Sequence, residues 1–154
     1  NLGSYYAPDI TRIETQMWFY YRATWLIDQG YEAFHLGSTP SMNGTSGYQA
    51  AWYNICTKIR EYAKTHARRG YVFLNAHTMN MIYNGNLVFD FNAWMTCAEV
   101  PAGETEGAPT EDNPQELEIK TGVTNAIYGK TQGGRHPLGF QLSRALFLVE
   151  LDNY

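Results

Sequence analysis

The sequence GYEAFHLG at residues 30–37 recurs in outline as GYVFLNAH at residues 70–77. In both stretches a Gly-Tyr pair opens a run of alternating apolar side chains, which is typical of a β-strand. A helical pattern precedes each stretch, over residues 11–29 and 47–69, and the glycine supplies the left-handed residue with which helices commonly end. A helix–strand unit that repeats after 40 residues predicts parallel strands joined by helical crossovers. We therefore expect an α/β fold built from parallel-stranded βα repeats.

The second helical segment carries a clear amphipathic pattern. Apolar residues recur at i, i+3, i+4 and i+7, which predicts a buried face with Cys56 on it as a free thiol. With only two cysteines, Cys56 and Cys97, the chain has no disulfide framework. The residues of this apolar stripe are Trp52, Ile55, Cys56, Ile59, Tyr62 and Ala63.

Both helical segments also begin with the spacing of a capping box, in which a hydroxyl and a carboxylate or amide satisfy free backbone N–H groups. The predicted boxes pair Thr11 with Glu14 and Ser46 with Gln49. In the first segment, the residues that recur at helical spacing are Ile13, Met17, Tyr20, Tyr21 and Thr24.

Beyond the second unit the pattern changes from helices to turns and short strands. Asn84-Gly85 is typical of a tight turn, and it precedes an apolar run. Pro, Gly and acidic residues dominate the segment 101–115, which we interpret as an exposed acidic loop. The other predicted elements are strands at 87–91, 116–120 and 146–152 and an irregular Gly-rich loop at 128–140.

Alternation along the predicted strands gives each strand one apolar face and one face that turns polar toward its C-terminal end. In a parallel barrel the active site lies at that end. Burying each of these polar groups without a partner would cost about 1–3 kcal/mol, so a solvated pocket is favoured, with a structural polar network as the alternative. The residues that would meet there are His35, Asn75, His77, Asp90, Asn92, Glu150 and Asp152.

Four phrases of the sequence carry a family resemblance: ETQMWFYYRATWLIDQGYEAFHLG, KIREYAKTHARRGYVFLNAHT, GNLVFDFNAW and LFLVELDNY. They resemble uncharacterised, glycoside-hydrolase-like (β/α)8-barrel proteins of gut Bacteroidetes. The resemblance implies a TIM-type barrel, which takes about 250 residues. A chain of 154 residues is then expected to be a single domain forming a partial barrel, a segment of a larger barrel or a half completed by another chain. After the first strand the chain departs from those proteins, with Ser38, Thr39 and Pro40 where they tend to carry a larger polar residue and sometimes an acid.

Glycoside hydrolysis commonly uses two carboxylates, one as acid and one as nucleophile or base. The candidates are Glu150, Asp90 and Asp152, and we favour Asp90 paired with Glu150 because the two acids usually come from different strands. An oligosaccharide or glycan is the expected partner, and no cofactor is expected. The predicted sugar-binding residues are His35, Asn75, His77, Asn92 and the stacking residue Trp94, whereas Trp52 is expected in the core.

Two other functions compete with hydrolysis by paired carboxylates. A metal-dependent hydrolase could use His35, His77, Asp90 and Asp152, but the sequence has no H-x-H or H-E-x-x-H motif. A barrel relic that binds carbohydrate or serves structure without catalysis is the other alternative.

Composition narrows the possible partners. Hydrophobic residues make up 44% and charged residues 17% of the chain, which is typical of a globular domain. The net charge of -4, with no basic stripe, disfavours nucleic acid as a partner. No apolar run reaches the roughly 20 residues of a membrane span, and no stretch has the pattern of a signal peptide. The sequence leaves the compartment open, with a secreted or periplasmic location as one option.

Overall fold

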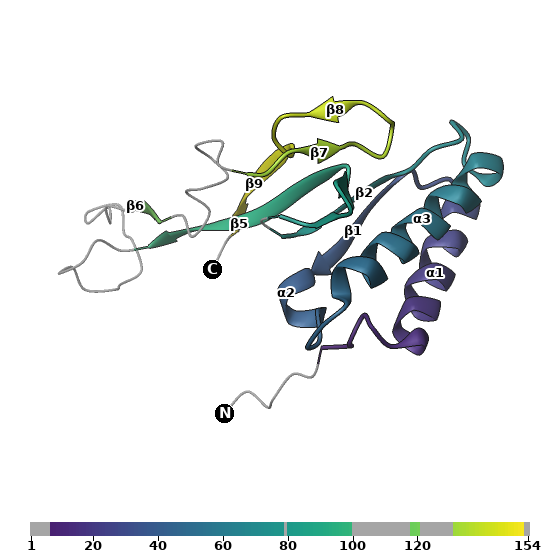
Figure 1. The fold of residues 1–154 in the computed structure, drawn as a ribbon, viewed down its shortest axis with the longest axis horizontal. Coiled ribbons are helices and arrows are strands. Elements are labelled where there is room, and N and C mark those ends of the chain that lie inside the picture. Colours follow the sequence, from purple (N-terminus) through teal and green to yellow (C-terminus); the bar gives the residue numbers. More distant parts are fainter. Residues whose placement is uncertain (1–6, 79, 100–117, 121–130, 153–154) are drawn as a thin grey trace, which may run out of the picture.

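The computed structural model describes residues 7–78, 80–99, 118–120 and 131–152, with the backbone alone for 94–99, 118–120 and 149–152. Figure 1 shows the elements in chain order. They are α1 (Ile13–Asp28), β1 (Ala33–Ser38), α2 (Thr39–Met42), α3 (Tyr48–His66), β2 (Phe73–His77), β3 (Ile82–Tyr83), β4 (Asn86–Leu87), β5 (Phe91–Glu99), β6 (Glu118–Lys120), β7 (Gly134–Arg135), β8 (Gln141–Leu142) and β9 (Phe147–Asp152).

The main sheet confirms the predicted α/β fold with parallel strands. Strands β1, β2, β5 and β9 run parallel in that order, and β6 pairs antiparallel with the far end of β5. Among the described residues this sheet is open rather than closed into a barrel, because β1 and β9 each pair on one side only. A second, small sheet has the order β3-β4-β7-β8.

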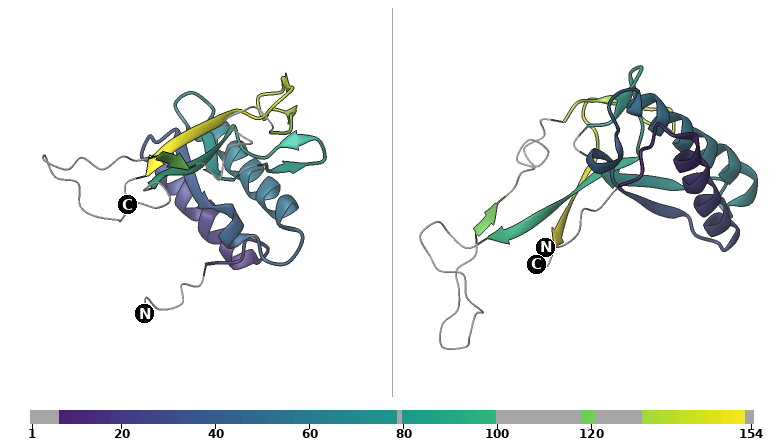
Figure 2. Two further views of the ribbon diagram at one scale, coloured as in Figure 1. Left: turned by 90° about the vertical axis from the view of Figure 1, so that its left-hand side faces the viewer. Right: turned by 90° about the horizontal axis from the view of Figure 1, so that it is seen from below.

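Helices α1 and α3 lie side by side on one face of the main sheet, and their inner residues form the core with that face (Figures 1 and 2). Strands β5 and β9 project beyond this helix layer (Figure 2). The opposite face of the sheet is open in the described structure, and Phe73 and Leu148 are each 48% exposed. We call this opposite side the open face.

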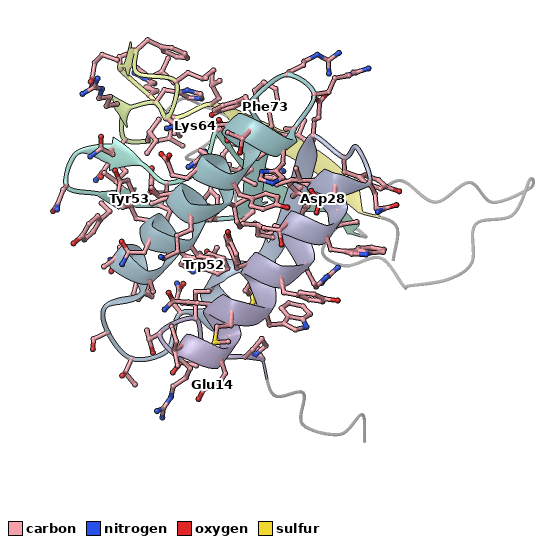
Figure 3. The ribbon with its side chains drawn as sticks, turned by 90° about the vertical axis from the view of Figure 1, so that its right-hand side faces the viewer. Glu14, Asp28, Trp52, Tyr53, Lys64 and Phe73 are labelled. Atoms are coloured by element: carbon pink, nitrogen blue, oxygen red, sulfur yellow. The ribbon has the colours of Figure 1, made fainter. Side chains whose placement is uncertain are left out.

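Helix α3 follows the predicted stripe closely. Trp52 is fully buried, with its indole N–H donating to Asn43 Oδ1 at 3.1 Å, and Cys56 is a buried free thiol, as predicted. Trp52 and Tyr53 are labelled on this helix in Figure 3. The predicted capping box is wrong, because the N-cap residue is Gly47, in a left-handed conformation with a φ of 75° and without a side chain to cap the helix.

Helix α1 departs from its predicted pattern. Its buried residues are Phe19, Ala23 and Ile27, whereas Ile13 and Met17 are each 63% exposed. Apolar residues occur all round this helix, so their spacing does not identify the buried face. The capping box at Thr11 and Glu14 is also wrong: Arg12 is the N-cap residue without a side-chain cap, and the Thr11 hydroxyl donates to Asp9.

The predicted strand 87–91 is wrong, although the turn before it is confirmed. Asn84 and Gly85 have φ values of 49° and 75° and join β3 to β4 in a hairpin. Residues 88–90 then bend away from this hairpin, and the long strand β5 begins only at Phe91. Because β5 starts later than predicted, the side chain of Asn92 lies on the opposite face of the sheet from the predicted one.

The structure tests the predictions for the C-terminal third of the chain only where it describes the residues. Strand β9 confirms the strand expected at 146–152, and β6 falls within the strand expected at 116–120. Part of the predicted irregular loop at 128–140 instead forms β7, which pairs with β8. The acidic loop predicted at 101–115 lies outside the described residues.

Candidate functional site

The open face carries three of the predicted polar residues on adjacent strands. The register places His35 of β1 beside Asn75 of β2, and His77 follows two positions later on β2. Neighbours in a parallel register point to the same side of a sheet. Leu74 and Ala76, which alternate with Asn75 and His77 along β2, and Val72 just before this strand are fully buried on the helix side. The structure therefore brings the three polar residues together on the face away from the helices.

The two imidazole rings of this group are in contact. The ring centroids of His35 and His77 lie 4.4 Å apart at an interplanar angle of 62°. Thr39, fully buried at the start of α2, donates its hydroxyl hydrogen bond to the carbonyl of His77 at 3.2 Å. Gly37, with a φ of 86°, lies where the register between β1 and β2 shifts. The contact with α2 thus fixes the carboxyl ends of both strands beside each other.

Glu150 and Asp152 follow on β9, whose backbone register is described. Leu148 pairs with Ala93, Glu150 with Met95 and Asp152 with Cys97. Since Ala93 also pairs with His77, these alternate positions belong to the open face. The two acidic positions are about 6.6 Å apart by strand rise.

Asp90 does not belong to this group, which corrects its predicted catalytic role. It precedes β5, so it lies at the amino end of that strand, and its side chain is only 1% exposed. By the register, Glu150 is five residues further along the neighbouring strand, about 16 Å away. Paired catalytic carboxylates lie about 5–9.5 Å apart, so the favoured pair of Asp90 and Glu150 is wrong.

Asp90 instead forms the centre of a buried polar network behind the sheet. Arg60 Nη2 on α3 donates to Asp90 Oδ2 at 2.9 Å, and the backbone N–H of Leu74 donates to the same oxygen at 2.8 Å. Tyr71 donates its hydroxyl to Asp90 Oδ1, and His136 Nε2 lies 3.1 Å from the Asp90 carbonyl. Burial, followed by the hydrogen bond to Asp90, raises the pKa of Tyr71. These contacts indicate a structural role.

Asn92 lies on the face of the sheet opposite to the predicted one, and Trp94 lies within a strand rather than beyond its end. Asn92 pairs with Ala76, whose side chain is buried under the helices, so its position faces the helix layer. Trp94, two positions further on β5, has the same alternation. The prediction for Asn92 is wrong because it rests on a strand that continues through residues 88–90, where the chain bends. Trp94 was expected just beyond the end of a strand, whereas β5 continues through it to Glu99, and its stacking role stays a prediction.

A groove beside His35 contains residues that the sequence pattern did not single out. It has a volume of about 390 Å³ and lies between α1 and the carboxyl end of β1, lined in part by Trp18, Arg22, Ser38 and Ser41. Trp18 is 48% exposed, and the guanidinium carbon of Arg22 lies 4.7 Å from the centre of its ring. The signal was present in the sequence, since Trp18 and Arg22 are four residues apart on a predicted helix.

Metal clusters and membrane-spanning helices are absent from the part of the chain that the structure describes. Within it, no three His, Cys, Asp or Glu side chains are grouped so that they could share a metal ion. None of the described helices has the length and apolar character that crossing a membrane requires. Comparison of the chain with protein-family models, with curated proteins and with solved structures found no match.

Proposed function

We propose that this chain is a glycoside-hydrolase-like segment of a (β/α)8 barrel, and that its open face binds a glycan. The observation that carries the proposal is the gathering of His35, Asn75 and His77 on one face, toward the carboxyl ends of parallel strands. This is the end of the strands at which parallel barrels bind their substrates. Imidazole and amide groups can both donate to and accept from sugar hydroxyls.

The groove beside His35 supplies the second element of a sugar site. The guanidinium of Arg22 lies over one face of the half-exposed Trp18 indole, so the other ring face is the one proposed to stack on a sugar. Ser38 and Ser41 offer hydrogen-bonding groups in the same groove. Apolar rings combined with a few placed polar groups are typical of small-molecule sites. We therefore propose that the sugar chain extends from the open face into this groove.

For the chemical step we propose Glu150 and Asp152 as the two carboxylates. Their backbone positions belong to the open face, and the separation of these positions, about 6.6 Å by strand rise, falls within the range of about 5–9.5 Å for paired catalytic carboxyls. One carboxylic acid would protonate the glycosidic oxygen while the other carboxylate assists attack at the sugar carbon.

Completion of the barrel would require a further strand–helix unit beside β1, supplied by another segment or another chain. The outer edge of β1 has no partner strand among the described residues. On the exposed side of α1, Tyr21 and Trp25 are 68% and 55% exposed. An apolar helix flank next to an unpaired parallel strand is the surface on which another such unit would pack.

Glycan binding by histidine variants tests the proposed site directly. We expect His35→Ala and His77→Ala to weaken binding of the best glycan in a screened panel at least tenfold, because each removes a hydrogen-bonding ring. His66→Ala, which removes an exposed histidine of α3, is the matched control and should bind as the unmodified chain does. Equal binding by all three variants, or no binding by any glycan of the panel, would contradict the proposal.

Hydrolysis by the same chain separates catalysis from binding. We expect Glu150→Gln to abolish turnover of the bound glycan while leaving its affinity within about threefold, because the amide keeps the size of the side chain but cannot transfer the proton. Binding without turnover in the unmodified chain would favour a carbohydrate-binding function. That alternative draws support from Asp90, whose carboxylate is engaged by Arg60 and Tyr71.

A further inference from the structure

A second cavity lies on the helix side of the molecule, away from the open face. Its volume is about 270 Å³, and it is formed by α3 and by the segment between β7 and β8. Tyr53, Thr57 and Arg60 line it from the helix, and Arg135 and His136 line it from the opposite side. In Figure 3 Tyr53 extends from the side of α3 that faces away from α1. We call this space the arginine cavity.

Arg60 has a hydrogen-bond donor without an acceptor among the described residues. Its Nη2 donates to the carbonyl of Val88 at 3.0 Å and to Asp90 Oδ2 at 2.9 Å, but its buried Nε has no acceptor in the described structure. A buried donor without a partner costs about 1–3 kcal/mol, and more when it is charged. Such donors are rare in folded proteins, and a bound water molecule or ion can satisfy them.

A second guanidinium faces the same cavity. Arg135 Nε donates to the carbonyl of Gly139 at 3.3 Å, which holds the side chain against the turn between β7 and β8. Guanidinium groups present parallel N–H donors that match the two oxygens of a carboxylate. A carboxylate between Arg60 and Arg135 would thus meet donors on both sides, and a small adjustment of Arg60 would give its Nε an acceptor.

The net charge of the groups around the cavity indicates the charge of the anion that fits it. His136 adds none, because its Nδ1 accepts the backbone N–H of Leu138 at 3.1 Å and its Nε2 therefore donates to the Asp90 carbonyl at 3.1 Å. The remaining charges are those of Arg60, Arg135 and the carboxylate of Asp90, which sum to a single positive charge. A monoanion balances this charge, whereas a phosphate dianion would leave an excess negative charge.

We propose that the arginine cavity binds a small hydroxylated monocarboxylate, such as a sugar acid. Arg60 and Arg135 would hold the carboxylate, and the hydroxyls of Thr57 and Tyr53 would meet those of the ligand. The volume of about 270 Å³ is just below the range of about 300–1,000 Å³ of sites for drug-sized ligands, so a ligand the size of one monosaccharide fits. This site is independent of the proposed glycan site.

Calorimetric titration of the intact chain with glucuronate, acetate and inorganic phosphate, at constant ionic strength, tests the proposal. We expect glucuronate to bind more tightly than acetate and phosphate, and Arg135→Gln and Thr57→Val to weaken its binding, the former by about tenfold or more. Arg68→Gln, which removes an exposed arginine elsewhere, is the matched control and should leave the affinity unchanged. Arg135 is the better position to vary than Arg60, because folding depends on the ion pair between Arg60 and Asp90.

The other outcomes overturn the proposal. Tighter binding of phosphate would show a site for a dianion, and equal losses in Arg135→Gln and Arg68→Gln would show nonspecific attraction by surface charge. No binding by any of the three anions would also contradict it. His35→Ala should leave glucuronate binding at this cavity unchanged, so failure of this site and failure of the glycan site are distinguishable.

Discussion

Arg60 and Asp90 form an ion pair of 2.9 Å that joins the middle of α3 to the residue before β5. The two side chains are 11% and 1% exposed, so salt screens the pair much less than it would screen a surface pair. The sequence places these residues 30 positions apart, and nothing in their local patterns connects them. The pair fixes the position at which the third parallel strand enters the sheet.

We predict that Asp90→Asn lowers the free energy of unfolding by about 3–5 kcal/mol, because it leaves the Arg60 charge buried without a counter-charge. Urea denaturation measures this loss. Asp28→Asn is the matched control: Asp28 accepts an exposed hydrogen bond from Tyr62, and its loss should cost about 0.5 kcal/mol or less. A similar small loss for both variants would contradict a structural role of Asp90.

Removing both partners tests the same pair from the other direction. Arg60→Met combined with Asp90→Leu should be more stable than Asp90→Asn alone, because neither charge then remains buried. If the double variant is the less stable of the two, the hydrogen bonds of Asp90 to Tyr71 and Leu74 matter more than the charge of Arg60.

Replacing Trp52 should destabilise the protein much more than replacing Trp25. Trp52→Ala should lower the free energy of unfolding by about 3–5 kcal/mol, because this side chain is fully buried and its removal leaves a cavity. Trp25→Ala removes an indole that is 55% exposed and should cost about 1 kcal/mol or less. Chemical denaturation of both variants compares them, and equal losses would contradict the described burial.

Glu32 gives a prediction for the stability at acidic pH. Burial would raise the pKa of Glu32, but the backbone N–H of Arg69 and the charges of Arg69 and Arg68 outweigh it and lower the pKa below its ordinary value of 4.5. A lowered pKa in the folded state stabilises the protein above that value, and the stabilisation is lost as the pH falls through the folded pKa. Glu32→Gln should therefore be less stable at pH 7 and lose less of its stability on acidification below pH 4.5 than the unmodified chain.

Thermal unfolding between pH 7 and pH 3 measures that difference. Glu61→Gln, which removes the exposed partner of Lys64, is the matched control and should follow the unmodified chain. Parallel curves for Glu32→Gln and the unmodified chain would mean that the contacts between Glu32 and Arg69 do not stabilise the fold.

Cys56 gives a prediction for thiol chemistry. Burial raises the pKa of Cys56 to about 12, and the thiolate is the reactive form. In a Cys97→Ser background, the native chain should resist iodoacetamide at pH 8 and become labelled only in denaturant. An added Thr65→Cys substitution, at an exposed position of the same helix, should react at once and serves as the control. Rapid labelling of Cys56 in the native chain would contradict its burial.

The sequence predicted the part of the fold in which local signals agree. The strands after the two helical segments alternate regularly and α3 has a single apolar stripe, so α3, β1 and β2 lie close to their predicted positions. Gly30 directly follows the C-cap of α1 in a left-handed conformation, as predicted, whereas α3 ends at His66, before Gly70. For α1 the existence of the helix was predictable, but its buried face was not. Aromatic and apolar residues occur on all sides of that helix. Packing against α3 and the sheet determines that Phe19, Ala23 and Ile27 are the buried ones.

The candidate site was predictable where a strand was correctly bounded. His35, Asn75 and His77 share the face that alternation assigned to them. Asp90 and Asn92 do not lie on the face predicted for them. The chain bends at residues 88–90, so the alternation of side chains predicted from residue 87 does not continue into β5. No periodic pattern encodes such a bend. It is set by long-range contacts of Asp90 with Arg60 and Leu74, which a local pattern cannot reveal.

Within the described part of the chain, the outer edge of β1 has no partner strand, and this has a practical consequence for handling the protein. Its backbone N–H and C=O groups are available to a strand of any other molecule, and the exposed side chains of α1 offer apolar surface beside them. Purified at high concentration, the chain is expected to self-associate through this edge. A Pro or Lys substitution at Ala33 or His35 on the strand should keep it in solution, although a change at His35 would also affect the glycan site.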